Sequence, residues 1–328
     1  MVFPVIHSTL DPDALKDEVM RRYDLPTPVR CQLVNRGNND FYEILAGSDR
    51  YALRVAKANF RTREAYVYET TYVRHLHTQG CLVPAPIPAK DGRLCFEVEA
   101  PEGVRSLTLM LWLDGVVFDK DLSVDDARDI GAALAALHSA GQSFTPATPR
   151  PLRATVMIDE RMPHLLKMLE SDPDQRAFYE QATQVVKAGY AALDGADVPR
   201  GPVHGDFQYA NVMRVAADAS GNSIAALDFD TCGTGYLAED IFTFMWRSDL
   251  DIQNENINSA FLQGYTSTRP LTPIEQSNLG LFRVARDLVM SSTFAMLINR
   301  IGPVPGFDGD FAPFTALAKS HLVESGLQ

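Results

Sequence analysis

Three polar residues, about two thirds of the way along the chain, have the types and spacing that phosphoryl transfer needs. Asp206 lies in the segment Val-His-Gly-Asp-Phe-Gln-Tyr-Ala-Asn, which ends at Asn211, and Asp228 follows the apolar run Ile-Ala-Ala-Leu. Moving a phosphoryl group to a hydroxyl requires a carboxylate that orients or accepts the hydroxyl proton, and oxygen ligands that hold Mg²⁺ on the phosphates. Asp206 fits the first task, and Asn211 and Asp228 fit the second.

The pattern of residues in the first third of the chain predicts a small sheet. Apolar and polar residues partly alternate there, and turns rich in Gly, Asn and Asp separate the runs, as in a meander of antiparallel strands. A helical pattern ends at Gly80, and the prolines at 84, 86 and 88 prevent its continuation. The predicted strands span 29–34, 41–45, 51–55, 94–98 and 107–113, and the predicted helix spans 62–77.

After a break at Asp114-Gly115, the chain becomes mainly helical. Ser123 with Asp126 is a capping-box start, and Thr272-Pro-Ile-Glu is a fuller helix-start signature, whose helix we predict to continue through 281–289. Two short strands, 201–215 and 223–228, are predicted around a hairpin loop. We therefore expect an α+β fold of two lobes, 1–108 and 116–328, with a hinge at 109–115 and a ligand cleft between them.

The pattern His-Gly-Asp206-x-x-x-x-Asn211, followed by an apolar strand ending in Asp228-Phe-Asp230, resembles the signature of the aminoglycoside phosphotransferase and choline kinase superfamily. That superfamily includes the type II homoserine kinases and the stress-response kinases, and the resemblance covers most of the chain. It implies a bilobal, protein-kinase-like fold with a small antiparallel-sheet N-lobe and a larger, mainly helical C-lobe.

The resemblance also implies an activity. The γ-phosphoryl group of ATP would move, with Mg²⁺, to a hydroxyl of a small molecule, with Asp206 as the catalytic residue and Asn211 and Asp228 as the metal ligands. The acceptor stays open among homoserine, choline or ethanolamine, an aminoglycoside, another antibiotic, a sugar and a protein side chain.

The same resemblance implies which side chains bind the nucleotide. Arg54, in the run Tyr-Ala-Leu-Arg-Val, stands where many family members have a lysine on the phosphates, and arginine can bind phosphate through two donors. Lys57 is its competitor. Glu69 is expected to pair with the basic residue, with Glu64 as the alternative, and Asn38 lies in the turn over the nucleotide.

The hinge region has two interpretations. The resemblance implies that Met110, Leu111 and Leu113 supply backbone hydrogen bonds to adenine. The same residues fit an ordinary apolar strand equally well.

Five other polar residues have roles that we interpret from the sequence. His204 is expected to pack behind the catalytic loop rather than to act in chemistry, and Asp240 to accept hydrogen bonds from the backbone of that loop. Asp230 fits a second magnesium ion, substrate orientation or the turn itself. Arg283 and Arg286 fit a solvated or salt-bridged helix face better than contact with an anionic substrate.

Composition excludes several classes of protein. The formal net charge of −12 argues against a general nucleic-acid binder, which needs a basic surface. No apolar run is long enough for a membrane span, and the N-terminus has no signal-peptide pattern, so we expect a cytoplasmic protein. Four cysteines without a C-x-x-C pair favour free thiols over a zinc site. The sequence leaves the oligomeric state open.

Three alternatives compete with this interpretation. Leu227-Asp228-Phe-Asp-Thr231 also matches the motif of haloacid-dehalogenase-type phosphatases, in which Asp228 would be a nucleophile, but the helical remainder of the chain and the unexplained segment around Asp206 argue against it. A non-catalytic nucleotide-binding regulator is disfavoured because all three polar residues are present. A Ser/Thr protein kinase of the same fold stays open.

Overall fold

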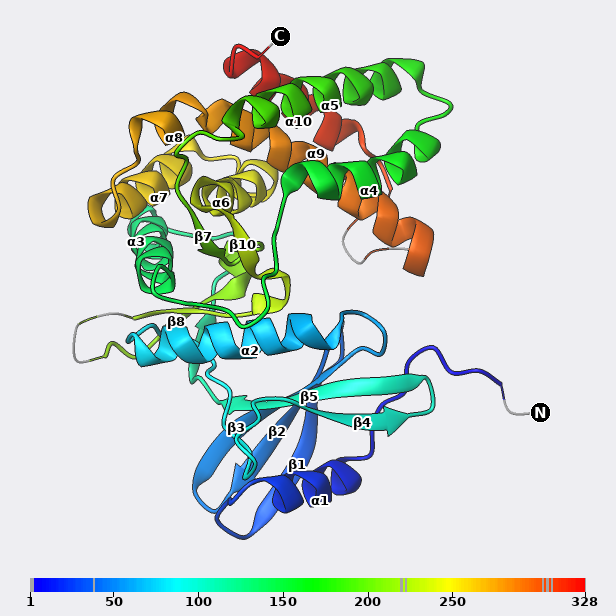
Figure 1. The fold of residues 1–328 in the computed structure, drawn as a ribbon, viewed down its shortest axis with the longest axis vertical. Coiled ribbons are helices and arrows are strands. Elements are labelled where there is room, and N and C mark those ends of the chain that lie inside the picture. The colour runs from blue at the N-terminus through cyan, green and yellow to red at the C-terminus, as the bar shows by residue number, and fades with distance from the viewer. Residues whose placement is uncertain are drawn as a thin grey trace. The chain divides into compact units, whose positions relative to one another are not determined.

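The computed structural model describes residues 3–37, 39–218, 221, 223–302, 304, 307 and 309–327. The chain forms two compact units, each built from three separate segments. The first unit comprises Met1–Val116, Ser143–Arg150 and Met213–Asp230, and the second comprises Val117–Gln142, Pro151–Val212 and Thr231–Gln328. A five-stranded antiparallel sheet, two smaller sheets and many helices confirm the predicted α+β class (Figure 1).

The first unit is built on a five-stranded antiparallel sheet with the order β1-β2-β3-β5-β4 (Figure 1). Apolar residues alternate along the central strands, so that one face of the sheet packs against Leu15 and Val19 of α1 (Pro12–Arg22). The strands are β1 (Val29–Asn35), β2 (Asn39–Ala46), β3 (Asp49–Ala56), β4 (Phe96–Ala100) and β5 (Gly103–Leu111). Strand β5 ends at Leu111, two residues before the end that we predicted.

Helix α2 (Arg63–Thr78) joins the distant segments of the first unit. The ring of Tyr72 lies 5.2 Å from that of Phe144 and 6.0 Å from that of Phe229, measured between ring centroids. These contacts attach segments 143–150 and 213–230 to the helix, because aromatic side chains bury large apolar areas. Strands β6 (Gly115–Val117), β8 (Val212–Val215) and β9 (Ile224–Ala226) form a small sheet with the order β6-β8-β9.

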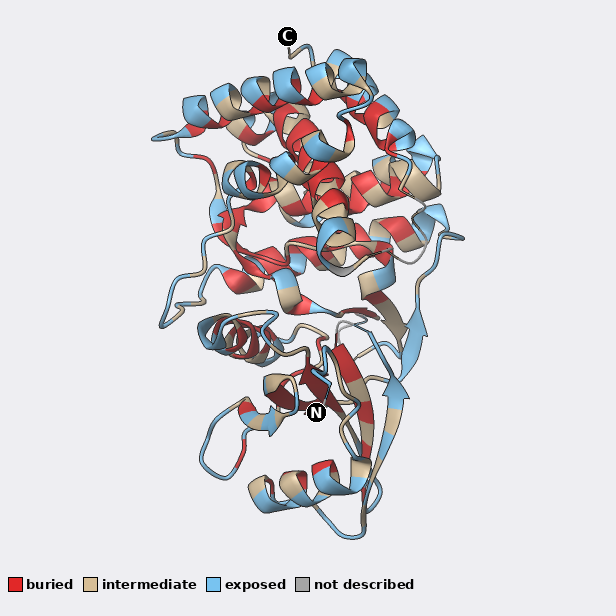
Figure 2. Cartoon of the chain, turned by 90° about the vertical axis from the view of Figure 1, so that its right-hand side faces the viewer, coloured by how far each residue is buried: buried red, intermediate tan, exposed pale blue. Residues whose placement is uncertain are grey.

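The second unit is mainly helical. Its helices are α3 (Val124–Gly141), α4 (Ala154–Met168), α5 (Pro173–Leu193), α6 (Leu237–Asp251), α7 (Glu255–Thr268), α8 (Pro273–Ser277), α9 (Leu279–Ile301) and α10 (Ala312–Glu324). A short ribbon pairs β7 (Arg200–Val203) with β10 (Gly233–Tyr236). Buried residues follow the inward sides of these helices (Figure 2). No helix among the described residues has the length and apolar character to cross a bilayer.

Two glycines bring α3 and α7 into close backbone contact. A Cβ atom on Gly131 would lie 2.0 Å from the carbonyl oxygen of Phe261, and one on Gly264 would lie 1.9 Å from that of Arg128. No other residue fits at these positions without separating the helices, because these separations are shorter than any van der Waals contact. The close packing places His138 of α3 beside Tyr265 of α7, with 2.8 Å between His138 Nδ1 and the Tyr265 hydroxyl.

The helix starts predicted from capping residues are confirmed, but one helix is shorter than expected. Ser123 with Asp126 and Thr272 with Glu275 both form complete capping boxes. The helix opened by Thr272 ends at Ser277, so the prediction that it continues through 281–289 is wrong. Asn278 leaves the helical backbone, with φ −116° and ψ 11°, and its side-chain amide donates to the Ile274 carbonyl at 2.8 Å. This local bond replaces the next helical bond, so α9 begins as a separate helix.

Candidate active site

The loop after β7 carries Asp206, and its backbone requires glycine at the preceding position. Gly205 has φ +80°, and a Cβ atom there would lie 2.6 Å from the Thr231 carbonyl oxygen. Both the left-handed conformation and the close approach exclude side chains. The His-Gly-Asp order therefore sets the position of Asp206 through the backbone.

Asp240, at the start of α6, holds this loop from behind. Its carboxylate accepts the backbone N–H of His204 at 2.6 Å and of Gly205 at 2.8 Å, which are the contacts predicted for it, and its Oδ2 lies 3.1 Å from His138 Nε2. Burial alone would raise the pKa of Asp240, but the hydrogen bond and charge of His138 and the backbone donor of His204 lower it below its usual value. An ionised, fully buried carboxylate thus anchors the loop, with His204 itself buried behind it.

Asp206 and Asn211 meet in the same loop, as their spacing predicts. The Asn211 amide nitrogen donates to the Asp206 carboxylate (Oδ2) at 3.0 Å and to its backbone carbonyl at 2.8 Å. About a third of the Asp206 side chain, 33%, stays exposed. Because the Asn211 nitrogen is used in this way, its oxygen Oδ1 points elsewhere and accepts no hydrogen bond from a described residue. A hard oxygen donor of this kind is what Mg²⁺ prefers, so the residue fits a metal ligand.

Arg286 of α9, for which the sequence analysis favoured a solvated or salt-bridged helix face, lies beside Asp206. Its Nη2 lies 3.2 Å from Asp206 Oδ1, and its Nη1 donates to the Gly205 carbonyl at 3.2 Å. Burial lowers the pKa of Arg286, although Asp206 and Asp240 act in the opposite direction. Its neighbour Arg283 instead pairs with Asp249, as expected for a salt-bridged face. Sequence spacing cannot separate the two arginines, because both lie on one side of the helix.

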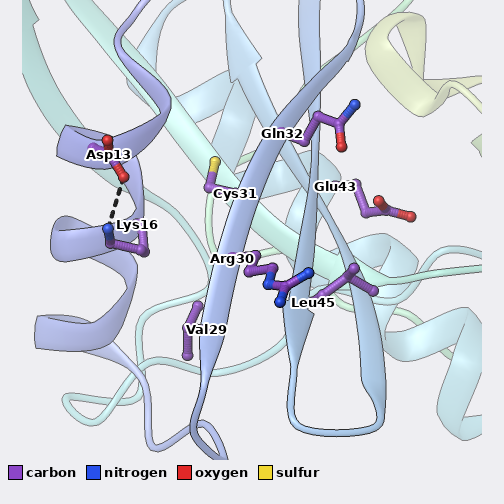
Figure 3. A pocket seen from close by; sticks show the side chains of 8 residues that line it. All are labelled: Asp13, Lys16, Val29, Arg30, Cys31, Gln32, Glu43 and Leu45. Carbon is purple, nitrogen blue, oxygen red and sulfur yellow. Dashed lines mark hydrogen bonds and ion pairs between the residues drawn. The ribbon is translucent and has the colours of Figure 1, made fainter.

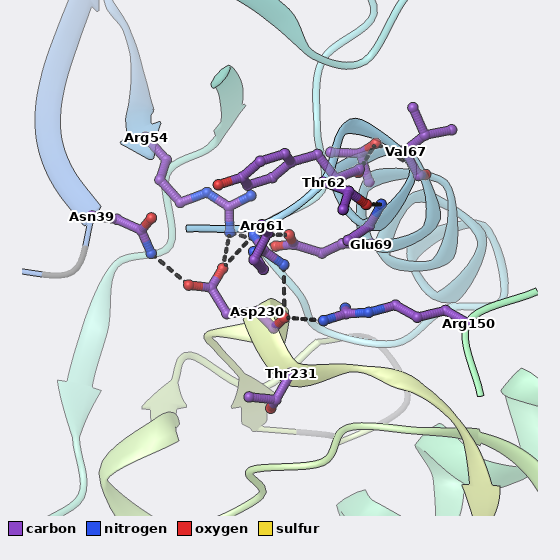
Figure 4. Close-up of polar contacts among 12 residues, drawn as sticks. Asn39, Arg54, Arg61, Thr62, Val67, Glu69, Arg150, Asp230 and Thr231 are labelled. Atoms are coloured by element: carbon purple, nitrogen blue, oxygen red, sulfur yellow. Dashed lines mark hydrogen bonds and ion pairs between the residues drawn. The ribbon is translucent and has the colours of Figure 1, made fainter. Parts of the chain in front are cut away.

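The first unit contains a buried cluster of two arginines and two carboxylates (Figure 4). Arg54 of β3 pairs with Glu69 of α2, as predicted, and its Nη1 also lies 2.9 Å from Asp230 Oδ1. Burial would raise the pKa of Glu69, but Arg54 and Arg61 lower it to about 2. Glu64, the alternative partner, is exposed in the first turn of α2.

Arg61 is the fourth member of this arginine–carboxylate cluster (Arg54, Arg61, Glu69 and Asp230), and the sequence analysis missed it. Its Nη2 lies 2.7 Å from Glu69 Oε2 and 2.8 Å from Asp230 Oδ1, and its Nη1 donates to the Asp230 carbonyl at 2.6 Å. Its guanidinium also stacks over the ring of Tyr66 at 4.2 Å. Arg61 lies just before Thr62, which caps α2, and nothing at that position in the sequence predicts these contacts.

Asp230 is held from several directions, whereas Asp228 is presented outward. Asn39 donates to Asp230 Oδ2 at 2.7 Å, and Arg150 donates to the Asp230 carbonyl at 3.0 Å. These contacts favour the structural interpretation of Asp230 over that of a metal ligand. Asp228 is exposed and has φ +56°, a left-handed conformation that Asp tolerates better than most residues. Because these contacts fix Asp230, they also limit the positions that the backbone of Asp228, two residues earlier, can take.

The remaining residues that we predicted to bind the nucleotide lie near the ends of strands. Met110 is buried in β5, and the Leu111 N–H donates to the Ala85 carbonyl at 2.9 Å, so this amide is already used within the protein. Leu113 follows the end of β5 and is half-buried, as is Lys57 just after β3. Asn38 lies outside the described residues.

A separate hollow of about 370 Å³ lies beside α1, β1 and β2 (Figure 3). Three of the charged residues on its wall already have partners, since Lys16 pairs with Asp13 at 2.7 Å and Glu43 pairs with Arg50. None of the predicted site residues lines it.

Comparison with proteins of known sequence and structure places the chain in a family. An uncharacterized Synechocystis protein, sll1119, is 31% identical over 286 residues, which cover 84% of this chain and 76% of the relative. A homoserine kinase from Paraburkholderia xenovorans is 25% identical over 294 residues, covering 87% of this chain and 84% of that enzyme.

Solved structures share the fold. A microcompartment-associated aminopropanol kinase has a TM-score of 0.75 at 20% identity, covering 96% of this chain and 99% of its own. The amicoumacin kinase hAmiN, solved with AMP-PNP, Ca²⁺ and Ami, has a TM-score of 0.72 at 16% identity, covering 96% of this chain and 94% of its own. The profile of the phosphotransferase enzyme family matches residues 31–271. The chain therefore belongs to the phosphotransferase enzyme family, and the phosphotransferase activity predicted from the Asp206 motif is confirmed.

Proposed function

We propose that this protein is an ATP- and Mg²⁺-dependent kinase that phosphorylates a hydroxyl of a small molecule. The observation that carries the proposal is the loop around Asp206, in which a partly exposed carboxylate is bound by Asn211 and Arg286 and the backbone is anchored on Asp240. A base positioned in this way suits transfer to an alcohol.

Asp206 is the proposed catalytic residue. One of its oxygens accepts a hydrogen bond from Asn211 and the other faces Arg286, so both contacts orient the carboxylate. That carboxylate can accept the hydrogen bond of the acceptor hydroxyl and take its proton as the oxygen bonds to the γ-phosphorus. The bond between the γ-phosphorus and the bridging oxygen breaks, and ADP leaves.

Nucleotide and metal binding are assigned by donor type. Arg54 contacts Glu69 and Asp230 through Nη1, whereas its Nη2 makes no hydrogen bond to a described residue and can meet a phosphate oxygen. The Asn211 oxygen and the Asp228 carboxylate are the proposed Mg²⁺ ligands, and the ion when bound neutralises charge on the phosphates. The similarity to hAmiN, which holds AMP-PNP and Ca²⁺, supports the use of a nucleotide and a divalent cation. Leu113 is the proposed contact for adenine.

We also propose that the roles are divided along the chain at the boundaries expected from the sequence. We assign nucleotide binding to 1–108, the hinge to 109–115, and catalysis and acceptor binding to 116–328. The names of the relatives favour a small acceptor, such as an amino alcohol, homoserine or an aminoglycoside, over a protein side chain.

The phosphatase alternative for Asp228 is wrong. The chain belongs to the phosphotransferase family, and Asp228 follows a strand in a small sheet with the order β6-β8-β9. This sheet lacks the repeated strand–helix units on which a haloacid-dehalogenase nucleophile lies.

The test is a coupled ADP-release assay with Mg²⁺, ATP and a panel of small hydroxyl compounds. We expect acceptor-dependent ADP release that Asp206→Asn reduces at least 10³-fold, whereas Asp159→Asn, an exposed carboxylate on α4, retains wild-type rates. Near-normal turnover by Asp206→Asn would remove Asp206 from the mechanism. Phosphate appearing only on an added protein such as casein would instead support the protein-kinase alternative.

A further inference from the structure

A row of arginines lies where α4 packs along α9. Arg286, Thr293 and Arg300 are seven residues apart on α9, which places them on one face of that helix. Arg161 of α4 reaches this face, because its Nη1 donates to the Thr293 hydroxyl at 2.7 Å. The two helices are in extensive contact and run side by side (Figure 1).

Arg161 has no carboxylate partner among the described residues, although it is half-buried. Burial lowers the pKa of Arg161. Glu160 partly opposes this effect, and the charges of Arg286 and Arg300 lower the pKa further. Arg161 therefore lies in the field of two other guanidinium groups, and no described carboxylate forms an ion pair with it.

Arg286 is also incompletely paired. It shares the partly exposed Asp206 carboxylate, and its Nε is buried without a hydrogen-bond partner among the described residues. A buried N–H without a partner costs free energy that a bound ligand can recover. At this end of the row, Arg286 therefore keeps one N–H donor without a partner, although it pairs with Asp206.

We propose that Arg161 and Arg286 bind an anionic group of the acceptor, so that the acceptor is a hydroxy acid. This inference rests on the proposed function, because it places the acceptor's hydroxyl at Asp206. Guanidinium groups bind carboxylates through paired N–H donors, which makes a carboxylate the fitting anion.

The spacing of the row limits the size of this acceptor. Arg286 touches Asp206, and Thr293, which holds Arg161, lies two helical turns or roughly 10 Å further along α9. An anion between the two arginines is therefore within a few bonds of a hydroxyl at Asp206. Short hydroxy acids span such a distance, whereas the same arginines repel an acceptor whose only charge is positive.

Three compounds separate the contributions of carboxylate and amine. L-homoserine carries both groups, 3-amino-1-propanol is the same molecule without the carboxylate, and 4-hydroxybutyrate is the same molecule without the amine. We expect kcat/KM for L-homoserine and for 4-hydroxybutyrate to exceed that for 3-amino-1-propanol at least tenfold. The opposite order, with 3-amino-1-propanol or choline as the best acceptor, would overturn the inference and leave the proposed kinase function standing.

Arg161→Gln tests the residue itself. We expect KM for the two carboxylate compounds to rise at least tenfold, with a much smaller change in kcat, so that preference for them over 3-amino-1-propanol falls by the same factor. Arg161→Lys should restore part of this preference, because it keeps the charge. Lys167→Gln, which removes an exposed charge from the same helix, is the matched control. An equal effect of Arg161→Gln on all three compounds would contradict a carboxylate site.

Failure of the proposed function is recognised separately. If no compound supports ADP release, binding of 4-hydroxybutyrate is measured by calorimetry on the wild-type protein and on Arg161→Gln. Binding that the substitution weakens tenfold supports the anion site without the kinase reaction, and absence of binding to the wild-type protein overturns it.

Discussion

At the scale of single residues, Asp228 combines an exposed carboxylate with a left-handed backbone. Its φ of +56° is a conformation in which Asn and Asp are enriched and in which alanine is strained. The residue therefore has two separable properties, its charge and its backbone conformation. Asparagine preserves the backbone preference and removes the charge.

Asp228→Asn should fold as the wild-type protein does but lose phosphoryl transfer, because the metal loses a charged ligand. We expect the Mg²⁺ concentration for half-maximal nucleotide binding to rise at least tenfold, measured by titration with a fluorescent ATP analogue. Asp228→Ala should show the same loss and also unfold more easily, by about 1 kcal/mol from backbone strain. Wild-type Mg²⁺ dependence in the asparagine variant would show that Asp228 is no ligand.

Arg61 tests the arginine–carboxylate cluster. In Arg61→Gln, Arg54 alone must balance the buried carboxylates of Glu69 and Asp230, so we expect a loss of about 3 kcal/mol in the free energy of unfolding. KM for ATP should also rise, because Arg54 is then held more firmly by the carboxylates.

Urea unfolding and the ADP-release assay measure the two effects of Arg61→Gln. Arg63→Gln, at an exposed position in the first turn of α2, is the control and should lie within about 0.5 kcal/mol of wild type. Equal stabilities of the two variants would mean that the cluster contributes nothing measurable.

At the scale of elements, a buried histidine connects three helices of the second unit. His321 of α10 places its Nδ1 2.9 Å from Asp287 of α9 and its Nε2 3.3 Å from Asp249 of α6. Burial by itself lowers the pKa of His321, but the two carboxylates outweigh that effect and raise it to about 9. The imidazolium is therefore the form that holds α10 against its neighbours.

This pKa gives a pH dependence with a definite sign. A histidine with a pKa raised in the folded state stabilises fully below its unfolded pKa of about 6.5, and this contribution disappears as pH rises through about 9. We expect the free energy of unfolding to fall between these pH values by on the order of 3 kcal/mol. His321→Gln should be less stable at pH 6.5 and should lack this decrease. Denaturant unfolding across the pH range measures it, and parallel curves for both proteins would refute the assignment.

At the scale of the whole molecule, the sequence predicted several of the contacts among the candidate site residues. Asp206, Asn211, Asp240 and Glu69 have the partners expected of them, because local spacing and a family motif determine those contacts. Arg61 could not be found in this way, since its contacts to Asp230 cross more than 160 positions of the chain and surface arginines are common.

The predicted boundaries of helices were wrong where side chains compete with the backbone for hydrogen bonds. The apolar pattern predicted one helix through Asn278, but the helix ends there because the side-chain amide of Asn278 donates to the Ile274 carbonyl. No pattern in the sequence predicted that segments 143–150 and 213–230 belong to the first unit. That membership depends on aromatic contacts to Tyr72, which only the folded chain brings together.

The first unit is made of three separate segments, which limits how a fragment of this chain can be designed. Because this unit takes Met1–Val116, Ser143–Arg150 and Met213–Asp230 from separate places, no single truncation isolates it. A fragment ending at residue 116 retains the five-stranded sheet but lacks Phe144 and Phe229, which cover α2, and Asp230, which neutralises Arg54 and Arg61. An expression design for the isolated unit must therefore splice all three segments through linkers. Exchange of this unit between relatives likewise requires five crossovers rather than one, because each of the two inner segments has two junctions.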